Sequence, residues 1–170
     1  IAYYSSTPDG LATKLDIGKL KTTIPKMDLQ NNLILIEDLL LKESDIVLEV
    51  TTNLDQKVDE VPKDIEKSLE EFVWPNWDIR IDKVSFIDDD FKYLVNGATV
   101  QPDTYNPNAL AISDLNFEAN SIYLKDKSAG ASISSLIFKE SSGLELNELV
   151  GELKVTDSKL TVDDFQLKLN

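Results

Sequence analysis

The sequence contains no cysteine and no histidine, and only one methionine, among its 170 residues. Without cysteine the chain forms no disulfide and offers no thiolate to a metal. Without histidine, the usual nucleophile and base pairs of hydrolases cannot be assembled, and the commonest zinc ligand is missing. The composition therefore predicts no catalytic residue, no metal site and no cofactor, and we do not expect an enzyme.

Basic residues are also scarce, with 17 Lys and Arg against 31 Asp and Glu and a net charge of -14. This balance argues against binding to nucleic acid and against electrostatic docking to an anionic membrane, because both need a basic surface. No apolar run approaches the ~18 residues of a membrane span, and the first residues do not resemble a signal peptide. Any membrane anchor or export signal is therefore expected outside these residues.

The clearest pattern in the sequence lies in residues 110–124, where apolar residues alternate as in a strand with one apolar face. Two of the steps, however, are three residues long. One extra residue absorbed as a β-bulge at Ser113-Asp114, and another at Asn120-Ser121, would return every apolar side chain to one face. The apolar positions are Leu110, Ile112, Leu115, Phe117, Ala119, Ile122 and Leu124. We therefore predict a twisted, curved strand.

The same spacing, at offsets 0, 2, 5, 7, 9, 12 and 14, recurs along the chain as a quasi-repeat. Two copies have a polar residue at offset 9, namely Glu43 and Asp88. The matches begin at Leu15, Ile34 and Ile79 and, in shorter form, at Ala131, Leu144 and Leu160. Residues 33–43 also have near-helical spacing, but we prefer a strand because residues 46–50 continue the bulged pattern.

The connections predicted between these segments are mostly short. Pro25 indicates an edge or bulge position, and residues 96–108 are rich in Gly, Pro and Asn, which is typical of a loop. Segments joined by short turns pair antiparallel as a rule. The turns are predicted at 5–10, 30–32, 125–130, 141–143 and 156–159.

Residues 51–76 depart from the strand pattern, and we interpret them as a helical insertion or connector. Pro62 suits the first turn of a helix, and the following residues place an apolar stripe on one face. The stripe consists of Ile65, Leu69, Phe72 and Val73. Such a helix could cap the apolar face of the sheet, but a connector whose stripe only packs is the commoner case.

Two smaller clusters have both a functional and a structural interpretation. Trp74 and Trp77 flank Pro75 and could stack on a ligand, but large anchors where a helix meets a sheet are commoner. Residues 88–90 are three consecutive Asp, which lack the alternating ligand spacing and the Gly of an EF-hand loop. We interpret them as a solvated turn in preference to a metal site.

The predicted fold is all-β: a curled, mainly antiparallel sheet with bulged strands and an apolar groove, plus one short amphipathic helix. It forms a single domain over residues 1–170, a fragment of a longer array. A one-faced sheet must cover its apolar face with another layer, with itself or with a ligand. The candidate groove residues are Leu15, Ile17, Leu20, Ile34, Ile36, Leu39, Leu41, Ile79, Ile81, Val84, Phe86, Leu110, Ile112, Leu115, Phe117, Ile133, Leu136, Phe138, Leu160, Val162 and Phe165.

Several stretches resemble the TamB (translocation and assembly module) family and the wider AsmA-like group. They are ISDLNFEANSIYLKDKSAGASISSLIFKESSGLELNELVGELKVTDSKLTVDDFQLKL, WDIRIDKVSF and GLATKLDIGKLKTTIPKMDLQNNLILIEDLLLKESDIVLEV. The resemblance implies an internal segment of a periplasmic protein that is anchored in the inner membrane of the Gram-negative envelope. It further implies a β-taco with an apolar interior, which carries phospholipid between membranes or supports outer-membrane protein assembly.

Two functions follow as hypotheses. The first is a lipid conduit whose partners are phospholipid acyl chains, and possibly outer-membrane assembly proteins. The second is a non-enzymatic structural spacer or protein-binding scaffold with a closed apolar core. In either case, the terminal strands should be exposed edges, through which the chain associates weakly, end to end, with a strength that salt increases.

Overall fold

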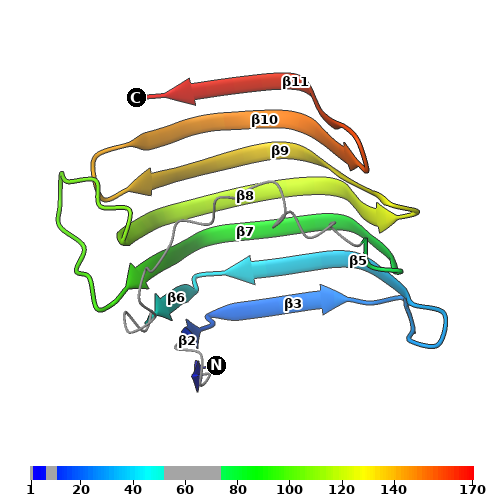
Figure 1. The fold of residues 1–170 in the computed structure, drawn as a ribbon, viewed down its shortest axis with the longest axis horizontal. Coiled ribbons are helices and arrows are strands. Elements are labelled where there is room, and N and C mark those ends of the chain that lie inside the picture. The colour runs from blue at the N-terminus through cyan, green and yellow to red at the C-terminus, as the bar shows by residue number, and fades with distance from the viewer. Residues whose placement is uncertain (1, 7–10, 52–73) are drawn as a thin grey trace, which may run out of the picture.

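The computed structural model describes residues 2–6, 11–51 and 74–170, and the strands in these ranges form one eleven-stranded sheet (Figure 1). The described residues contain no helix, and thus none that is long and apolar enough to cross a membrane. The strands are β1 (Ala2–Ser6), β2 (Leu11–Asp16), β3 (Lys19–Thr23), β4 (Lys26–Asp28), β5 (Leu33–Lys42), β6 (Asp45–Val50), β7 (Asp78–Val95), β8 (Ala109–Lys125), β9 (Ser128–Glu140), β10 (Glu145–Thr156) and β11 (Leu160–Leu169).

The second half of the chain is a meander, in which β7 to β11 pair with their sequence neighbours in antiparallel fashion (Figure 1). Residues 96–108 join β7 to β8 without strand structure. The turn between β8 and β9 is tighter than predicted, because residues 128–130 already belong to β9. The positive φ angles of Asp126 and Lys127 allow the chain to reverse within these two residues.

The first half of the chain is built differently, because β5 and β6 lie end to end along β7 and run parallel to it. The rule for short turns does not cover this pair, because the connection is long, and the sheet as a whole is mainly antiparallel, as predicted. Residues 51–77 separate β6 from β7 and exceed the dozen or so residues that a parallel crossover needs. The predicted helix falls on this connection, and its residues up to 73 lie outside the described ranges.

The bulges predicted in β8 are confirmed. Asp114 and Ser121 have φ angles of 53° and 54°, and the pairing of β8 with β9 shifts register at both places. Asp and Ser suit these positions because short polar side chains tolerate left-handed backbone better than branched apolar ones. The extra residues keep the apolar side chains on one face and bend the strand.

Further interruptions line up with the first of these bulges across neighbouring strands. Glu43 separates β5 from β6 and has a φ of 52°, and Asp88 in β7 has a φ of 54°. On the other side of Glu43 lies Gly18, where an added Cβ would collide with the carbonyl oxygen of Glu43. Gly18, Glu43, Asp88 and Asp114 thus form a line of kinks across the sheet, and Gly18 is required by the close approach of two backbones.

The quasi-repeat is the reason that the strands pair in the observed register. From Ile34 opposite Ile79 to Val50 opposite Val95, each residue of β5 and β6 that is paired lies beside the residue numbered 45 higher. Equivalent repeat positions therefore lie side by side in the parallel pair. The offset pattern also reads the same backwards, so an antiparallel neighbour matches it too, as where Phe86 faces Phe117. Both kinds of pairing place apolar residues in rows that cross the strands.

The sheet is open and not strongly curled, so the taco-like shape predicted from the sequence is not formed by the described residues. Among the described strands, β11 pairs with β10 alone, and none of them joins it to the edge that contains β1, β3 and β4. The bulges bend individual strands, but this bending is not enough to bring the two edges of the sheet together. Among the described residues, four apolar side chains are buried, namely Val84, Ala109, Ala119 and Leu146.

Candidate functional site: the apolar face

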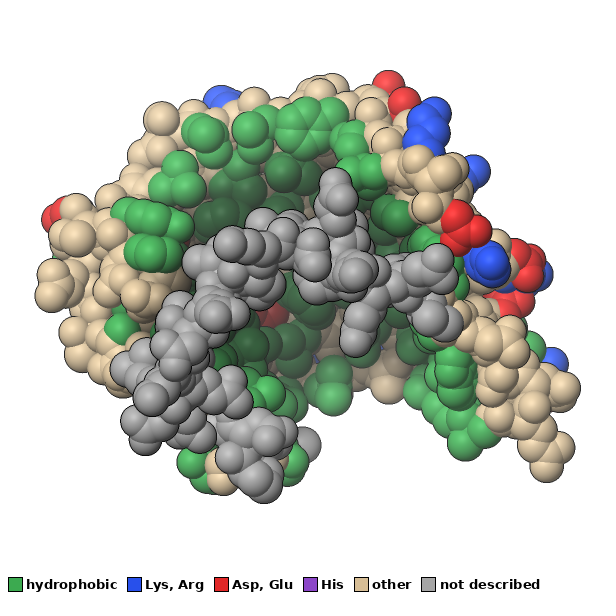
Figure 2. Space-filling model, viewed as in Figure 1, with side chains coloured by type: hydrophobic (Ala, Val, Ile, Leu, Met, Phe, Trp, Pro, Cys, Tyr) green, Lys and Arg blue, Asp and Glu red, His purple; other side chains and the backbone are tan. Residues whose placement is uncertain are grey.

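One face of the sheet gathers hydrophobic side chains over a shallow hollow (Figure 2). The register of the strands places these side chains in rows that run across the sheet, perpendicular to the strands. One complete row reaches from β4 to β11 and consists of Met27, Ile34, Ile79, Leu124, Ala129, Val155 and Leu160. At about 4.8 Å between strands, its six steps span ~29 Å.

A second row contains an aromatic pair. The rings of Phe86 and Phe117 lie with their centroids 5.5 Å apart at an interplanar angle of 46°. This is a tilted arrangement, which is favourable for aromatic pairs. The row consists of Leu20, Leu41, Phe86, Phe117 and Leu136.

A third row, next to the one with the two Phe rings, contains several buried positions. Val84 and Ala119 are buried there, and Gly151 lies opposite Ile133. The ring of Phe165 lies over Gly151, because a Cβ added to this glycine would contact the Phe165 ring at 3.5 Å. The full row is Thr22, Leu39, Val84, Ala119, Ile133 and Gly151. Three of its members, Val84, Ala119 and Gly151, are therefore buried within the sheet.

Every candidate groove residue except Ile17 lies in a strand of this sheet, and Ile17 lies in the break between β2 and β3. Among them only Val84 is buried, whereas the others are half-buried or exposed. The candidate set missed the β10 residues of the face. These are Leu146, Leu149, Leu153 and Val155, of which the short repeat starting at Leu144 had already indicated the first three.

The interpretation of residues 88–90 as a solvated turn is wrong, because they lie inside β7. Asp88 is exposed and accepts a hydrogen bond from the Asn116 amide at 3.3 Å. Asp89 is 1% exposed and lies in register with Leu115 of the apolar face. The extra residue at Asp88 therefore places Asp89, and not Asp88, beside the apolar face, which the pattern did not reveal.

Asp89 links the break between β5 and β6 to β7. Its carboxylate accepts a hydrogen bond from the backbone N–H of Ser44 at 2.8 Å and another from that of Ile87 at 3.1 Å. Burial raises the pKa of Asp89, although the hydrogen bonds from Ser44 and Ile87 oppose this shift. Ser44 is itself 2% exposed and donates its hydroxyl to the carbonyl oxygen of Lys42. This polar pair replaces strand hydrogen bonds that are lost at the line of kinks.

The opposite face carries ion pairs, although Ile137 also lies on it. Lys83 pairs with Glu118, and Lys139 with Asp114, each at 2.9 Å. These side chains are about half exposed, and such surface pairs stabilise a protein only slightly. The sheet therefore has one face that water solvates well and one that it does not.

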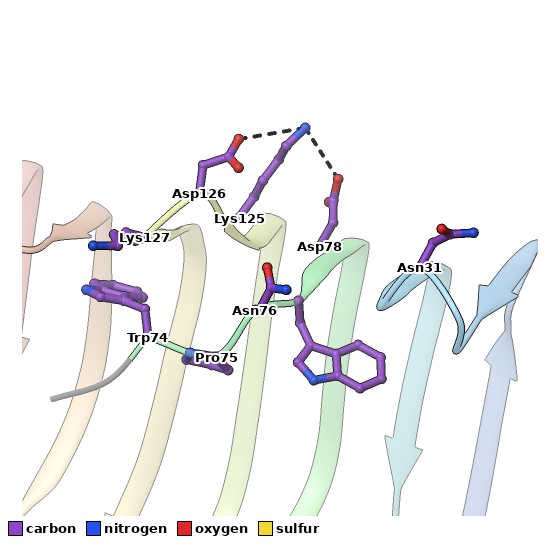
Figure 3. A pocket seen from close by; sticks show the side chains of 9 residues that line it. Asn31, Trp74, Pro75, Asn76, Asp78, Lys125, Asp126 and Lys127 are labelled. Carbon is purple, nitrogen blue, oxygen red and sulfur yellow. Dashed lines mark ion pairs between the residues drawn. The ribbon is translucent and has the colours of Figure 1, made fainter.

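A cavity of about 460 Å³ lies at the rim, where β7 begins and the turn from β8 to β9 reverses (Figure 3). Trp74 and Trp77 both line it, together with polar side chains. The Lys125 ammonium there lies 3.3 Å from Asp78 and 4.0 Å from Asp126 (Figure 3). Lys127, beside Trp74 in the figure, pairs with Asp157 at 3.8 Å. The charged side chains of this rim pair with each other. The cavity therefore gives no reason to expect a charged ligand of one particular sign.

The described residues hold no group of three or more acidic side chains that could bind a metal. Every buried side-chain nitrogen or oxygen in the same ranges has a hydrogen-bond partner. What the arrangement offers is therefore a large apolar surface with one buried carboxylate, suited to contact with apolar groups.

The comparisons with known proteins gave no relative: no family model, no curated protein and no solved structure matches this chain.

Proposed function

We propose that the apolar face binds phospholipid acyl chains, and that the chain is a segment of a TamB-like periplasmic protein that carries lipid between the inner and outer membranes. On this proposal the rows form the bottom of a groove, along which an acyl chain lies while its headgroup stays in water. The full-length protein would be anchored in the inner membrane. Support for outer-membrane protein assembly belongs to the same proposal.

The observation that carries the proposal is the continuity of the apolar face combined with its incomplete burial. Rows of Ile, Leu and Phe pass from strand to strand along the stacking direction, so an apolar ligand would meet a similar surface at each strand. Soluble proteins rarely leave so large an apolar surface without an occupant.

The energetics favour an acyl chain as this occupant. Exposing a 16-carbon chain to water costs about 12 kcal/mol, at ~0.8 kcal/mol for each CH₂. Contact with the apolar face removes a large part of this cost. When the acyl chain slides along a row from one strand to the next, its contact area with the face changes little. A bound acyl chain can therefore move along the face, because its binding free energy is similar at adjacent positions of a row.

The alternative was a spacer or scaffold with a closed apolar core. This alternative needs a second layer or a closed sheet, whereas the described strands form one open layer with four buried apolar side chains. The observation thus favours the conduit over the spacer.

The test is photocrosslinking of a phospholipid that carries a diazirine in its acyl chain, with native mass spectrometry as a second readout. Phe117→Asp puts a charge in the aromatic row and should reduce crosslinking at least tenfold. Ile137→Asp is the matched control, because Ile137 is a large apolar residue that lies in register with Asn116 on the opposite face. Circular dichroism verifies that both variants fold. Equal crosslinking of both folded variants and the wild type would contradict the proposal.

A further inference from the structure

The cavity at the rim, where β7 begins and β8 turns into β9, is lined by both tryptophans of the sequence. Trp74 and Trp77 are half-buried, so part of each indole surface remains accessible to a ligand. The cavity volume of about 460 Å³ lies in the range of small-molecule sites. This rim cavity therefore offers both room and aromatic surface to a small polar group.

The charged side chains that line the rim cavity are balanced. They are Asp78, Asp126, Lys125 and Lys127, two carboxylates against two ammonium groups. A ligand with a net charge gains little from such a lining, whereas a ligand that carries both signs finds a partner for each. The net charge of -14 on the whole chain further disfavours an anion.

Two of these four groups are held firmly and two are not. Asp78 accepts hydrogen bonds from Arg80 at 3.0 and 2.9 Å and lies 3.3 Å from the Lys125 ammonium. By contrast, the side chains of Asp126 and Lys127 are 85% and 70% exposed, and their ion-pair distances are 4.0 and 3.8 Å. Exposed pairs of this kind contribute little, so a ligand can replace them at small cost.

The tight turn between β8 and β9 fixes where the two loosely held charges lie. Asp126 and Lys127 are the two residues between these strands, with φ angles of 49° and 57°. Lys127 lies beside Trp74, and the Asp126 carboxylate extends toward Lys125 (Figure 3). The turn therefore presents one hydrogen-bond acceptor and one donor of opposite charge, close together. A ligand whose cation and anion are joined by a short linker can contact both.

The charged and aromatic side chains of the rim cavity lie at different levels. The side chains of Lys125, Asp126 and Asp78 point beyond the ends of the strands, whereas Trp74 and Pro75 lie in front of the strands (Figure 3). The charges are thus outermost, toward water, and the aromatic ring lies nearer to the sheet.

The apolar face begins directly next to the rim cavity. Ile79 follows Asp78, Leu124 precedes Lys125, and Ile79 and Leu124 are partners in the complete apolar row. The order from water inward is therefore charged groups, indole rings and aliphatic side chains. A phospholipid has the same order of charged headgroup, glycerol esters and acyl chains, and Trp is enriched at the corresponding level of a bilayer.

We propose that the rim cavity binds the zwitterionic headgroup of a phospholipid, which is a phosphodiester that carries an ammonium group. The phosphate lies at Lys127, the ammonium lies at Asp126, and the glycerol esters lie against Trp74 and Trp77. The acyl chains continue from there onto the row that contains Ile79. This inference rests on the proposed function, because it assigns the headgroup end of the same lipid. It gives the lipid a defined orientation and selects against anionic phospholipids.

Intrinsic tryptophan emission reports on this cavity alone, because both tryptophans of the sequence line it. The probes are monomeric dihexanoylphosphatidylethanolamine, the anionic dihexanoylphosphatidylglycerol with the same acyl chains, and glycerophosphoethanolamine, which has none. The ethanolamine lipid should shift the emission saturably, and the anionic lipid should bind at least tenfold more weakly. Glycerophosphoethanolamine should shift the emission in the same direction, with lower affinity than the lipid.

Three results with these probes would count against the proposal. The absence of a saturable shift with the ethanolamine lipid would overturn it, and so would equal affinities for the ethanolamine and the anionic lipid. Equal affinities for glycerophosphoethanolamine and the ethanolamine lipid would overturn the assignment to a lipid, because the site would then recognise the free phosphodiester.

A charge reversal at the turn tests the residue that is assigned to the phosphate. Lys127→Glu should weaken binding of the ethanolamine lipid by about tenfold or more, because a charge-assisted hydrogen bond is replaced by repulsion. Lys21→Glu is the matched control: Lys21 is 63% exposed and Lys127 is 70% exposed, and each lies 3.8 Å from a carboxylate. Circular dichroism verifies that both variants fold. Equal affinities of the two folded variants would overturn the assignment of Lys127.

The headgroup site and the acyl-chain site can fail separately. Phe117→Asp, which should reduce acyl-chain crosslinking, should leave the affinity for glycerophosphoethanolamine within twofold of the wild type. Acyl-chain crosslinking to a wild-type protein whose tryptophan emission responds to none of the three probes would refute the headgroup site alone. A saturable response to glycerophosphoethanolamine without any acyl-chain crosslinking would support the site for this headgroup chemistry and refute acyl-chain binding.

Discussion

Replacement of Asp89 by Ala tests whether a buried carboxylate holds the line of kinks together. Removing it leaves the backbone N–H groups of Ser44 and Ile87 without their acceptor. A hydrogen bond to a charged group contributes about 1.5–3 kcal/mol, so two contribute about 3–6 kcal/mol. Release of the carboxylate from its buried position offsets part of this loss. We therefore expect a net destabilisation of about 2–4 kcal/mol.

Urea unfolding followed by circular dichroism measures this change. With a slope of ~2–3 kcal/mol per M, the midpoint of Asp89→Ala should fall by about 1 M. Asp82→Ala is the control, because Asp82 is exposed on the same strand. If the two midpoints agree within about 0.2 M, the carboxylate does not stabilise the kinks and the reasoning is refuted.

The pH dependence of Asp89 gives an independent check with a defined sign. Its pKa is raised by burial, so the folded state holds the proton more tightly than the unfolded state does. The resulting stabilisation is complete below the unfolded value of ~3.9 and is lost as the pH rises through the folded pKa. Asp89→Asn does not titrate, so the stability of the wild type relative to this variant should fall over that interval. A difference that rises with pH there would contradict the assignment.

Three further variants test other parts of the structure. Gly18→Ala should destabilise by about 3 kcal/mol in urea unfolding, at the upper end for overpacking, because the Glu43 carbonyl oxygen blocks the new Cβ and is itself backbone; a neutral effect would mean that the two backbones separate easily. Glu140→Gln should flatten the dependence of stability on pH at acid pH. Burial alone would raise the pKa of Glu140, but hydrogen bonds from Ser142 and Ser141 outweigh burial and lower the pKa. The stability that Glu140 contributes is therefore lost as the pH falls through that lowered pKa. An unchanged dependence at acid pH would refute this sign. Lys83→Ala should leave the urea midpoint nearly unchanged, and a large loss would show that its exposed pair with Glu118 is worth more than such pairs usually are.

The face pattern and the bulges could be predicted because they are local properties of the sequence. A three-residue step between apolar positions has few structural solutions, and Ser113-Asp114 and Asn120-Ser121 supply residues that tolerate the required backbone. The same pattern identified almost all residues of the candidate face before any pairing was known.

The direction of β5 and β6 relative to β7 could not be predicted in this way. A palindromic pattern matches a parallel and an antiparallel neighbour equally well, so the apolar positions carry no information about direction. The burial of Asp89 was missed for a related reason. Three consecutive Asp residues give no signal of which one the bulge turns inward, although the polar residue at offset 9 in two copies marked the place. The curl of the sheet was overestimated, because it is the sum of many small twists between strands, and the sequence pattern does not give the size of each twist.

The central claim, that acyl chains occupy one face of this sheet, is tested most directly at two adjacent residues of β9. Leu136 lies in register with Phe117 on the apolar face, whereas Ile137 lies in register with Asn116 and is 41% exposed on the other face. A photoreactive benzophenone residue at each position, in separate proteins, reports contact with a radiolabelled phospholipid acyl chain. The account predicts strong lipid labelling at position 136 and at most a tenth of it at position 137. Equal labelling at both positions, or stronger labelling at position 137, would contradict it.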